Sequence, residues 1–254
     1  MKYSAVNAKV KGMSAKLLSY EDYLSLCECA NTHDMILKLK NYKAYSHISD
    51  DGTSLERQLF SSLYDDYIKI KGFINDNAIR KYLEKLLLKG GDLHYYTNLW
   101  KAKNKLLKGI NKDIATSVTG TEIDMQNIIR IYRLKIYYKP AKEYIYKHIL
   151  PINYKISSEM IMQMAEADNE VNLLTLIKST HYGEYFSEEQ RIEESFYEAQ
   201  SLAYKHARKR SQNSIAPVIC YIFRKELELR NIISISEGVN YSLKPHDIIR
   251  QMPG

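Results

Sequence analysis

The stretch that decides the fold is Glu122-Ile-Asp-Met-Gln-Asn127-Ile-Ile-Arg-Ile131, because it returns near the end of the chain as Glu226-Leu-Glu-Leu-Arg-Asn231-Ile-Ile-Ser-Ile235. Acid, apolar, acid, apolar, polar, Asn, Ile and Ile match in register, at a displacement of 104. A fixed displacement of this kind predicts one helical unit that is used more than once, in a scaffold built by stacking.

A second element repeats at a different displacement. The segment from Leu18 to Tyr45 matches the segment from Ile156 to Tyr182, and Ser242 to Ile248 resembles the start of a third copy. This second displacement is longer than one period of the first repeat and shorter than two. The spacing therefore predicts that part of one unit is absent, with the junction near Leu88 to Asp92.

Composition places the chain among ordinary soluble proteins. Of its 254 residues, 45% are hydrophobic and 26% are charged. The longest stretch without charge, Ser211 to Phe223, contains Pro217 and is too short to span a membrane. The amino end lacks the apolar core of a signal peptide, which favours residence in the cytosol. Three cysteines are too few for a four-cysteine zinc site, and their odd number argues against a disulfide framework.

Nearly every segment has the apolar spacing of a helix. Ser19 and Thr32 are candidate N-caps, a helix over 92–108 is expected to end at Gly109, and Thr121 with Asp124 is expected to cap the helix that carries Asn127. A capping-box sequence at 187–190 predicts a further long helix. No sustained alternating pattern predicts a strand. The predicted class is all-α, with helical pseudo-repeats.

Basic residues gather in one region. Lys101, Lys105, Lys108 and Lys112 are spaced as one face of a helix. This face is either solvated or a binding surface for a partner, and the partner would be an acidic protein surface or anionic headgroups.

Residue patterns for catalysis are absent from the sequence. It contains no glycine-rich phosphate loop, no His-Glu-x-x-His pair and no nucleophile elbow, so no catalytic residue, metal or cofactor is predicted. The 22 tyrosines are scattered at helical spacings, which favours packing over nucleic-acid stacking. Asn127 and Asn231 share stripes with isoleucines, so each amide should be buried, hydrogen-bonded and able to fix the register of a repeat interface.

The segment from Glu122 to Lys135 resembles the acid, Asn, Leu, Lys, x, x, Leu, Arg, x, Lys signature of the C-subunit family of V-type ATPases and ATP synthases, whose eukaryotic members are called d subunits. Asn127, Arg133 and Lys135 align with it, whereas Ile129 replaces the signature Lys. Residues 3–18 resemble the amino-terminal helix of the family, and residues 225–248 its last repeat. The repeated Asp124 and Glu228, with Asn231, complete the set of candidate motif residues.

The resemblance implies a funnel of helices with pseudo-threefold symmetry, peripheral on the cytoplasmic face of the membrane. Members of the family catalyse nothing and couple the central shaft of a rotary ATPase to the membrane ring of proteolipid subunits during proton or sodium transport. Their membrane association is indirect, through the ring, and no nucleic acid is involved. The implied organisation is a partial first unit over 1–53, a full unit with Asn127 over 54–186 and a second unit with Asn231 over 187–254, within one compact body. A generic α-helical adaptor is the alternative, and an all-α isoprenoid enzyme is disfavoured because acidic metal motifs are missing.

Overall fold

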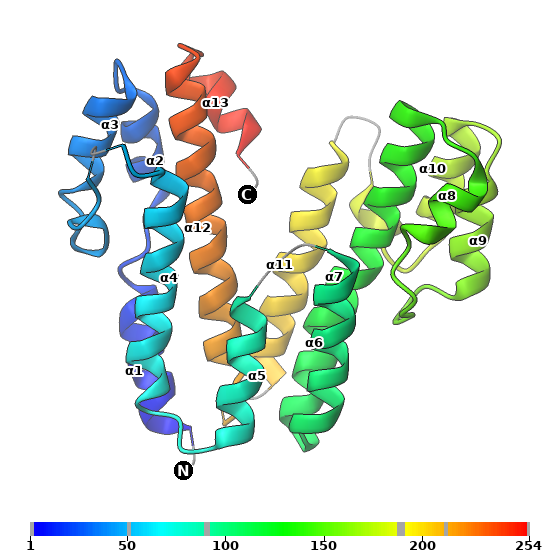
Figure 1. Cartoon of the computed structure of the whole chain (residues 1–254), viewed down its shortest axis with the longest axis horizontal. Helices are drawn as coiled ribbons and strands as arrows, with labels where there is room; N and C mark the ends of the chain where they lie inside the picture. The colour runs from blue at the N-terminus through cyan, green and yellow to red at the C-terminus, as the bar shows by residue number, and fades with distance from the viewer. Residues whose placement is uncertain (1–2, 50–51, 89–91, 187–190, 211–212, 253–254) are drawn as a thin grey trace. The chain divides into compact units, whose positions relative to one another are not determined.

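The computed structural model describes residues 3–49, 52–88, 92–186, 191–210 and 213–252, and these ranges are built from helices and connecting turns (Figure 1). No strand occurs among them. The prediction of an all-α fold is therefore confirmed. The capping box predicted at 187–190 lies outside the described residues.

Two compact units divide the chain. Unit 1 combines Met1–Asn75 with Pro217–Gly254, and unit 2 is the continuous segment Asp76–Ala216. These units group helices by their contacts in space, whereas the predicted segments 1–53, 54–186 and 187–254 follow the repeats along the sequence. That predicted division stays a prediction.

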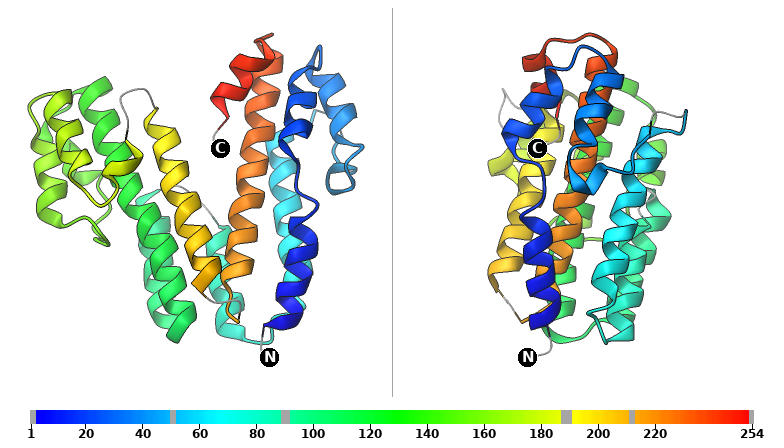
Figure 2. Two further views of the ribbon diagram at one scale, coloured as in Figure 1. Left: turned by 180° about the vertical axis from the view of Figure 1, so that it is seen from behind. Right: turned by 90° about the vertical axis from the view of Figure 1, so that its left-hand side faces the viewer.

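Unit 1 joins both ends of the described chain. Its short carboxyl-terminal helix α13 packs against α2 near the amino end (Figure 2). The core includes the fully buried Leu26, Met35 and Leu59 from the amino-terminal part and Ile232 and Ile235 from the carboxyl-terminal part. Its elements are α1 (Ser4–Ser14), α2 (Tyr20–Cys27), α3 (Thr32–Leu39), η1 (Lys43–Tyr45), α4 (Leu55–Lys71), α12 (Ala216–Asn240) and α13 (Pro245–Gln251).

Unit 2 is built around one long helix, α7, which packs against α11 and α6 (Figure 1). Met125, Ile128 and Ile131 of α7 are fully buried in a core shared with the helical hairpin α9–α10. The elements are α5 (Asn77–Leu87), α6 (Leu93–Leu106), α7 (Gly109–Arg133), η2 (a π-helical turn, Leu134–Tyr138), α8 (Lys142–Lys147), α9 (Ser158–Glu166), α10 (Glu170–Lys178), η3 (Gly183–Tyr185) and α11 (Ile192–Arg210).

The two helical hairpins, α2–α3 and α9–α10, share their capping residues. Ser19 and Ser157 cap the first helix of each hairpin, and Asn31 and Asn169 cap the second. Each side chain accepts a hydrogen bond from the backbone N–H three residues later, which satisfies a donor at the start of the helix. Ser19 and Ser157, and likewise Asn31 and Asn169, are separated by the same number of residues as the two copies of the second repeated element in the sequence. Thr32, which was predicted as a cap, is instead the first residue of α3.

The long helices α7 and α12 end in the same way. The N–H of Lys139 donates to the carbonyl of Leu134, and the N–H of Leu243 donates to that of Gly238. Both bonds span five residues, as in a π-helical turn, and they keep the displacement of the first repeat. A short helix follows in each case, α8 after α7 and α13 after α12. By this placement Ser242 to Ile248 corresponds to the segment after the first repeat helix, whereas its sequence was interpreted as a copy of the Leu18 element.

Two sequence predictions about this region are wrong. Thr121 does not cap a helix, because α7 begins at Gly109 and runs through Thr121 to Arg133. The four lysines do not lie on one helix, because Leu107 and Lys108 are extended between α6 and α7. Gly109 has φ +50°, a left-handed conformation that glycine adopts without steric cost, and this turn separates the two helices.

Candidate functional site

Unit 2 holds its hairpin through a buried carboxylate on α7. Asp124 accepts hydrogen bonds from the backbone N–H of Tyr154 at 3.3 Å and of Lys155 at 2.7 Å, and from the hydroxyl of Tyr182 at 3.0 Å. Burial raises the pKa of Asp124 to about 6, although the hydrogen bonds from Lys155 and Tyr182 favour the charged form. These contacts tie α7 to the segment before α9 and to the turn after α10.

Asn127 forms a second tie one helical turn further along α7. Its side-chain amide donates to the carbonyl of Leu150 at 3.1 Å, and its amide oxygen accepts from the N–H of Leu150 at 2.8 Å. The side chain is 1% exposed. The amide thus satisfies both backbone groups of one buried residue, which fixes the register between the helix and the chain that follows α8. We call Asp124, Asn127 and their partners the unit 2 clamp.

Unit 1 has a clamp at the matching register of α12. Glu228 accepts hydrogen bonds from the backbone N–H of Leu18 at 2.5 Å and from the hydroxyl of Tyr45. The ammonium group of Lys225 lies 2.6 Å from the Glu228 carboxylate, 2.7 Å from the Tyr45 hydroxyl and 4.2 Å from the centre of the Tyr45 ring. Both members of this ion pair are 2% exposed. We call this set the unit 1 clamp.

Asn231 is buried like Asn127, at 1% exposed. Its side chain hydrogen-bonds the hydroxyl of Tyr23 on α2. Burial, followed by the charge of Glu228, raises the pKa of Tyr23, so this hydroxyl stays protonated. Both asparagines therefore tie a repeat helix to a neighbouring segment of its own unit, Asn127 through backbone groups and Asn231 through a side chain. Their predicted burial is confirmed.

The tyrosines of the clamps were not selected from the sequence as site residues. Tyr45 and Tyr182 close the two copies of the second repeated element, so the repeat contained a signal for them. Lys225 gave no such signal, because a lysine next to other charged residues in a helix, here Arg224 and Glu226, is most often solvated.

The other predicted motif residues lie at the end of α7. Arg133 forms an ion pair with Glu193 of α11 at 2.6 Å, in which both side chains are substantially exposed. Lys135 donates to the carbonyl of Ala165 at 3.1 Å, close to the end of α9. Both residues therefore connect α7 or its π-helical extension to other helices of unit 2.

The predicted basic surface is divided between two helices. Lys101 and Lys105 are exposed on α6, Lys108 is exposed in the turn, and Lys112 is partly buried on the first turns of α7. Lys103, between the first two, is 2% exposed, and its ammonium group lies 3.3 Å from the centre of the Trp100 ring. Burial, with a smaller effect of the Lys112 charge, lowers the pKa of Lys103 to about 8.

Within the described ranges, no group of three or more His, Cys, Asp or Glu side chains is arranged to hold a metal ion. The same ranges contain no helix whose length and hydropathy would let it cross a bilayer. Cys27 and Cys220 are buried free thiols, and Cys29 is a partly buried one.

Two helical units, each with a buried acid and a buried asparagine on its longest helix, define an all-α protein. The sequence profile described as ATP synthase (C/AC39) subunit matches residues 6–90 and 92–251. The chain belongs to this family.

Relatives in archaea agree with this assignment. The C subunit of the A-type ATP synthase of Methanocaldococcus jannaschii is 26% identical over 261 residues, covering 96% of this chain and 59% of the relative. The protein of the same name in Pyrococcus abyssi is 28% identical over 169 residues, covering 63% of this chain and 45% of the relative. The protein of the same name in Methanobrevibacter smithii is 24% identical over 217 residues, covering 81% of this chain and 54% of the relative. The chain thus spans between about half and three fifths of the length of these curated relatives.

Proposed function

We propose that the chain is a non-catalytic central-stalk subunit of a V-type or A-type rotary ATPase, which couples the central shaft to the membrane ring of proteolipid subunits. Its place is peripheral, on the cytoplasmic face of the membrane, with the ring as its attachment. Family membership supports this role, and so do the relatives named as parts of A-type ATP synthases.

The observation that carries the proposal is the pair of buried clamps. A part that transmits torque must resist relative movement of its helices under load. In each unit a hydrogen-bonded acid and an asparagine, one turn apart, tie the longest helix to a neighbouring segment. Such ties are buried, so water does not compete for them.

Helix lengths support the inference that one unit is shortened. The pair α4–α5 corresponds to the pair α11–α12. The start of α11 follows the start of α4, and the start of α12 follows the start of α5, by nearly the number of residues that separates the two copies of the second repeated element. However, α5 has 11 residues and α12 has 25, so α5 stops before the position that would match Glu228. The family match is also interrupted at residue 91, inside the predicted junction. We infer that the third clamp is missing and that the socket for the shaft is incomplete.

Co-purification tests the central-stalk role. A tagged chain is expressed in the organism from which it comes, and the membranes of these cells are solubilised in mild detergent. Shaft and ring subunits are expected in the eluate in fixed proportion to the tagged chain, and raised salt should release them, because screening weakens ion pairs between proteins. Recovery of unrelated proteins without shaft or ring subunits would favour the generic adaptor and overturn the proposal.

Charge reversal tests the basic surface as the contact with these partners. The variant K101E/K105E/K108E is expected to lose the partner subunits, while K11E/K16E/K40E, which reverses three exposed lysines of unit 1, keeps them. Retention by both variants would leave the central-stalk role standing and remove these lysines from the interface.

Calorimetry with ATP tests the non-catalytic character. We expect no heat of binding at micromolar concentrations from the isolated chain. Micromolar binding would move the protein into an enzyme class.

A further inference from the structure

Burial does not explain the tyrosines at the ends of the repeat helices, because their side chains are exposed. Several apolar positions that match between α7 and α12 are buried in both helices, as Ile128 with Ile232 and Ile131 with Ile235 are. Tyr137 and Tyr241 also match at the displacement of the first repeat, yet they are 69% and 74% exposed. A side chain that two copies share and neither copy buries is expected to act outside its own unit.

In unit 2 this position is part of a larger exposed corner. Tyr138 is 76% exposed and Tyr144 is 49% exposed, so three large aromatic side chains face solvent within a short segment. We call residues 137–147 the tyrosine corner. Single exposed aromatic residues are common on protein surfaces, whereas three within one short segment are expected where the surface meets a partner.

The backbone holds the corner in a defined conformation. Lys139 has φ +46°, a left-handed conformation that costs energy for a residue with a side chain, and its N–H closes the π-helical turn on Leu134 at 2.7 Å. The ring of Tyr137 packs edge-on against Tyr132, with centroids 6.4 Å apart. The ring of Tyr144 stacks on His148 at 4.1 Å. The tyrosines are thus presented from an ordered surface, which lowers the entropic cost of binding.

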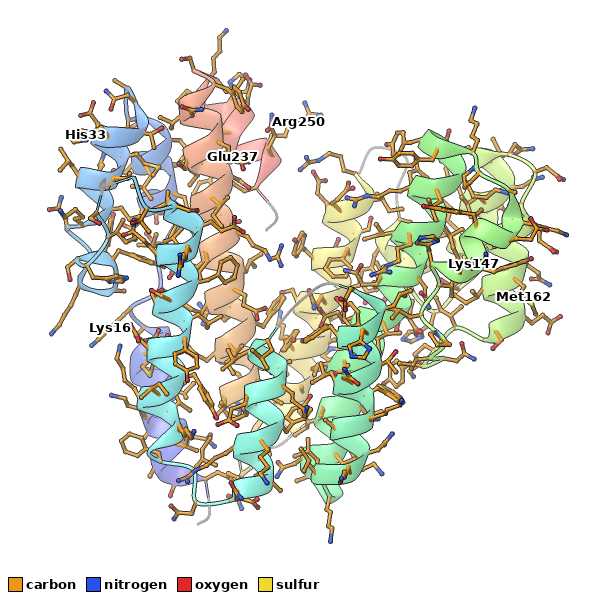
Figure 3. All side chains as sticks on the ribbon, in the orientation of Figure 1. Lys16, His33, Lys147, Met162, Glu237 and Arg250 are labelled. Carbon is orange, nitrogen blue, oxygen red and sulfur yellow. The ribbon has the colours of Figure 1, made fainter. Side chains whose placement is uncertain are left out.

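The charge of the corner is positive. Lys139, Lys142 and Lys147 are exposed, and Glu143 is the acid within the corner. Lys147 is labelled on α8 in Figure 3. Lys142 lies 3.4 Å from Glu166, but both side chains are more than half exposed, so the pair is weak and exchanges readily with another anion. The surface therefore suits an anionic partner.

Together, tyrosine and lysine distinguish between two kinds of partner. Tyrosine is enriched at protein–protein interfaces as well, but lysine is depleted from their centres, so it is the lysines among these tyrosines that favour a lipid surface. Tyrosine lies favourably at the headgroup level of a bilayer, and lysines beside it are attracted to anionic lipids. We propose that the tyrosine corner docks on the anionic phospholipid headgroups of the membrane surface. This contact goes beyond the proposed function, in which the ring alone attaches the chain to the membrane.

Vesicle flotation tests the proposal with the full chain and no other protein, so its result does not depend on the rotary role. At low ionic strength the chain should float with phosphatidylglycerol vesicles and remain behind with phosphatidylcholine vesicles. Raised salt should release it, because the lysine contribution is screened within about 10 Å at 0.1 M salt.

Variants assign the binding to the corner. Replacing Lys139 by Ala should weaken binding about fivefold, or about 1 kcal/mol, and Tyr137→Ser with Tyr138→Ser should weaken it by at least as much. Tyr64→Ser is the matched control, because Tyr64 is 58% exposed but is followed by Asp65 and Asp66. It should bind as the parent chain does. Circular dichroism of each variant should be unchanged, since these side chains are exposed.

Three outcomes would overturn the proposal. The first is no flotation with phosphatidylglycerol at low salt. The second is equal binding by the parent chain and the corner variants. The third is binding of single-stranded oligonucleotides in place of vesicles, which would assign the tyrosines to base stacking.

Discussion

In unit 1 the buried carboxylate of Glu228 faces the ammonium group of Lys225, whereas in unit 2 the carboxylate of Asp124 is met by backbone N–H groups and the hydroxyl of Tyr182. Thr121 of α7 occupies the position that matches Lys225 of α12. Thr121 hydrogen-bonds Tyr182 in the unit 2 clamp, just as Lys225 hydrogen-bonds Tyr45 in the unit 1 clamp. Two copies of one arrangement therefore stabilise a buried acid differently. In unit 1 the ammonium group of Lys225 neutralises the carboxylate of Glu228. In unit 2 the carboxylate of Asp124 can be neutralised by binding a proton.

Removing the cation of unit 1 should have the largest effect. Lys225→Met leaves Glu228 buried without its counter-charge and is expected to lower the free energy of unfolding of unit 1 by about 3–5 kcal/mol. Chemical denaturation followed by circular dichroism measures the loss. The only tryptophan, Trp100, lies in unit 2, so its fluorescence transition should move much less. The double variant K225M/E228Q should recover part of the loss, and a lack of recovery would argue against charge as the cause.

The acid of unit 2 should make that unit sensitive to pH. A carboxyl whose folded pKa is raised stabilises the fold most when it is protonated. Since the folded pKa of Asp124 is about 6 against an ordinary value of 3.8, the contribution is present below about pH 4 and is lost as pH rises through about 6. The groups that face the Asp124 carboxylate are the Tyr182 hydroxyl and the backbone N–H groups of Tyr154 and Lys155.

The expected loss across this window is about 2–3 kcal/mol, from about 1.4 kcal/mol for each unit of pKa shift. It is measured as the difference in the free energy of unfolding between the parent chain and Asp124→Asn, followed by Trp100 fluorescence. The difference should change steadily between about pH 4 and 6. A constant difference would show that Asp124 does not titrate in this range.

Replacing Asn127 tests the second tie of the unit 2 clamp. Asn127→Ala leaves the buried N–H of Leu150 without its acceptor, whereas the Leu150 carbonyl keeps the N–H of Ile152 as a donor. The variant should cost about 1–3 kcal/mol in Trp100-detected unfolding. Asn231→Ala is the matched variant in unit 1. It should move the circular dichroism transition and leave the Trp100 transition largely in place. Equal movement of both transitions in both variants would mean that the units unfold together.

The smallest effect is expected at the surface of unit 2. The ion pair between Arg133 and Glu193 is half exposed, so Arg133→Ala should lower the free energy of unfolding by only about 0.2–1 kcal/mol. A double-mutant cycle with Glu193→Ala isolates the pair. A coupling above this range would show that the ion pair belongs to a larger network.

The parts of the fold that depend on local periodicity are predictable from the sequence. The helices, the two repeated elements and the burial of both asparagines follow from apolar spacing and capping residues. The error at Thr121 arose because a threonine followed three residues later by an acid resembles a cap, although here both side chains serve contacts inside a long helix. Local patterns do not distinguish these two uses.

The contents of the clamps depend on contacts that are distant in sequence. Lys225 is buried because Tyr45 and Glu228 surround its ammonium group, and the tyrosine lies 180 residues away. Nothing in the spacing around a lysine reports such a partner. Similarly, the break between α6 and α7 depends on the left-handed Gly109, whereas the lysine spacing across it continued without interruption.

The origin of unit 1 from two distant segments bears on the order of folding. Its clamp joins Glu228 to Leu18, 210 residues apart, while the Asp124 clamp closes over 30 to 58 residues. Closing a longer loop costs more entropy, and contacts between distant residues slow folding. During synthesis unit 2 is therefore expected to fold first, as one continuous stretch. The amino-terminal hairpin must wait for α12 to emerge from the ribosome, and until then it is the part of the nascent chain most exposed to chaperones and proteases.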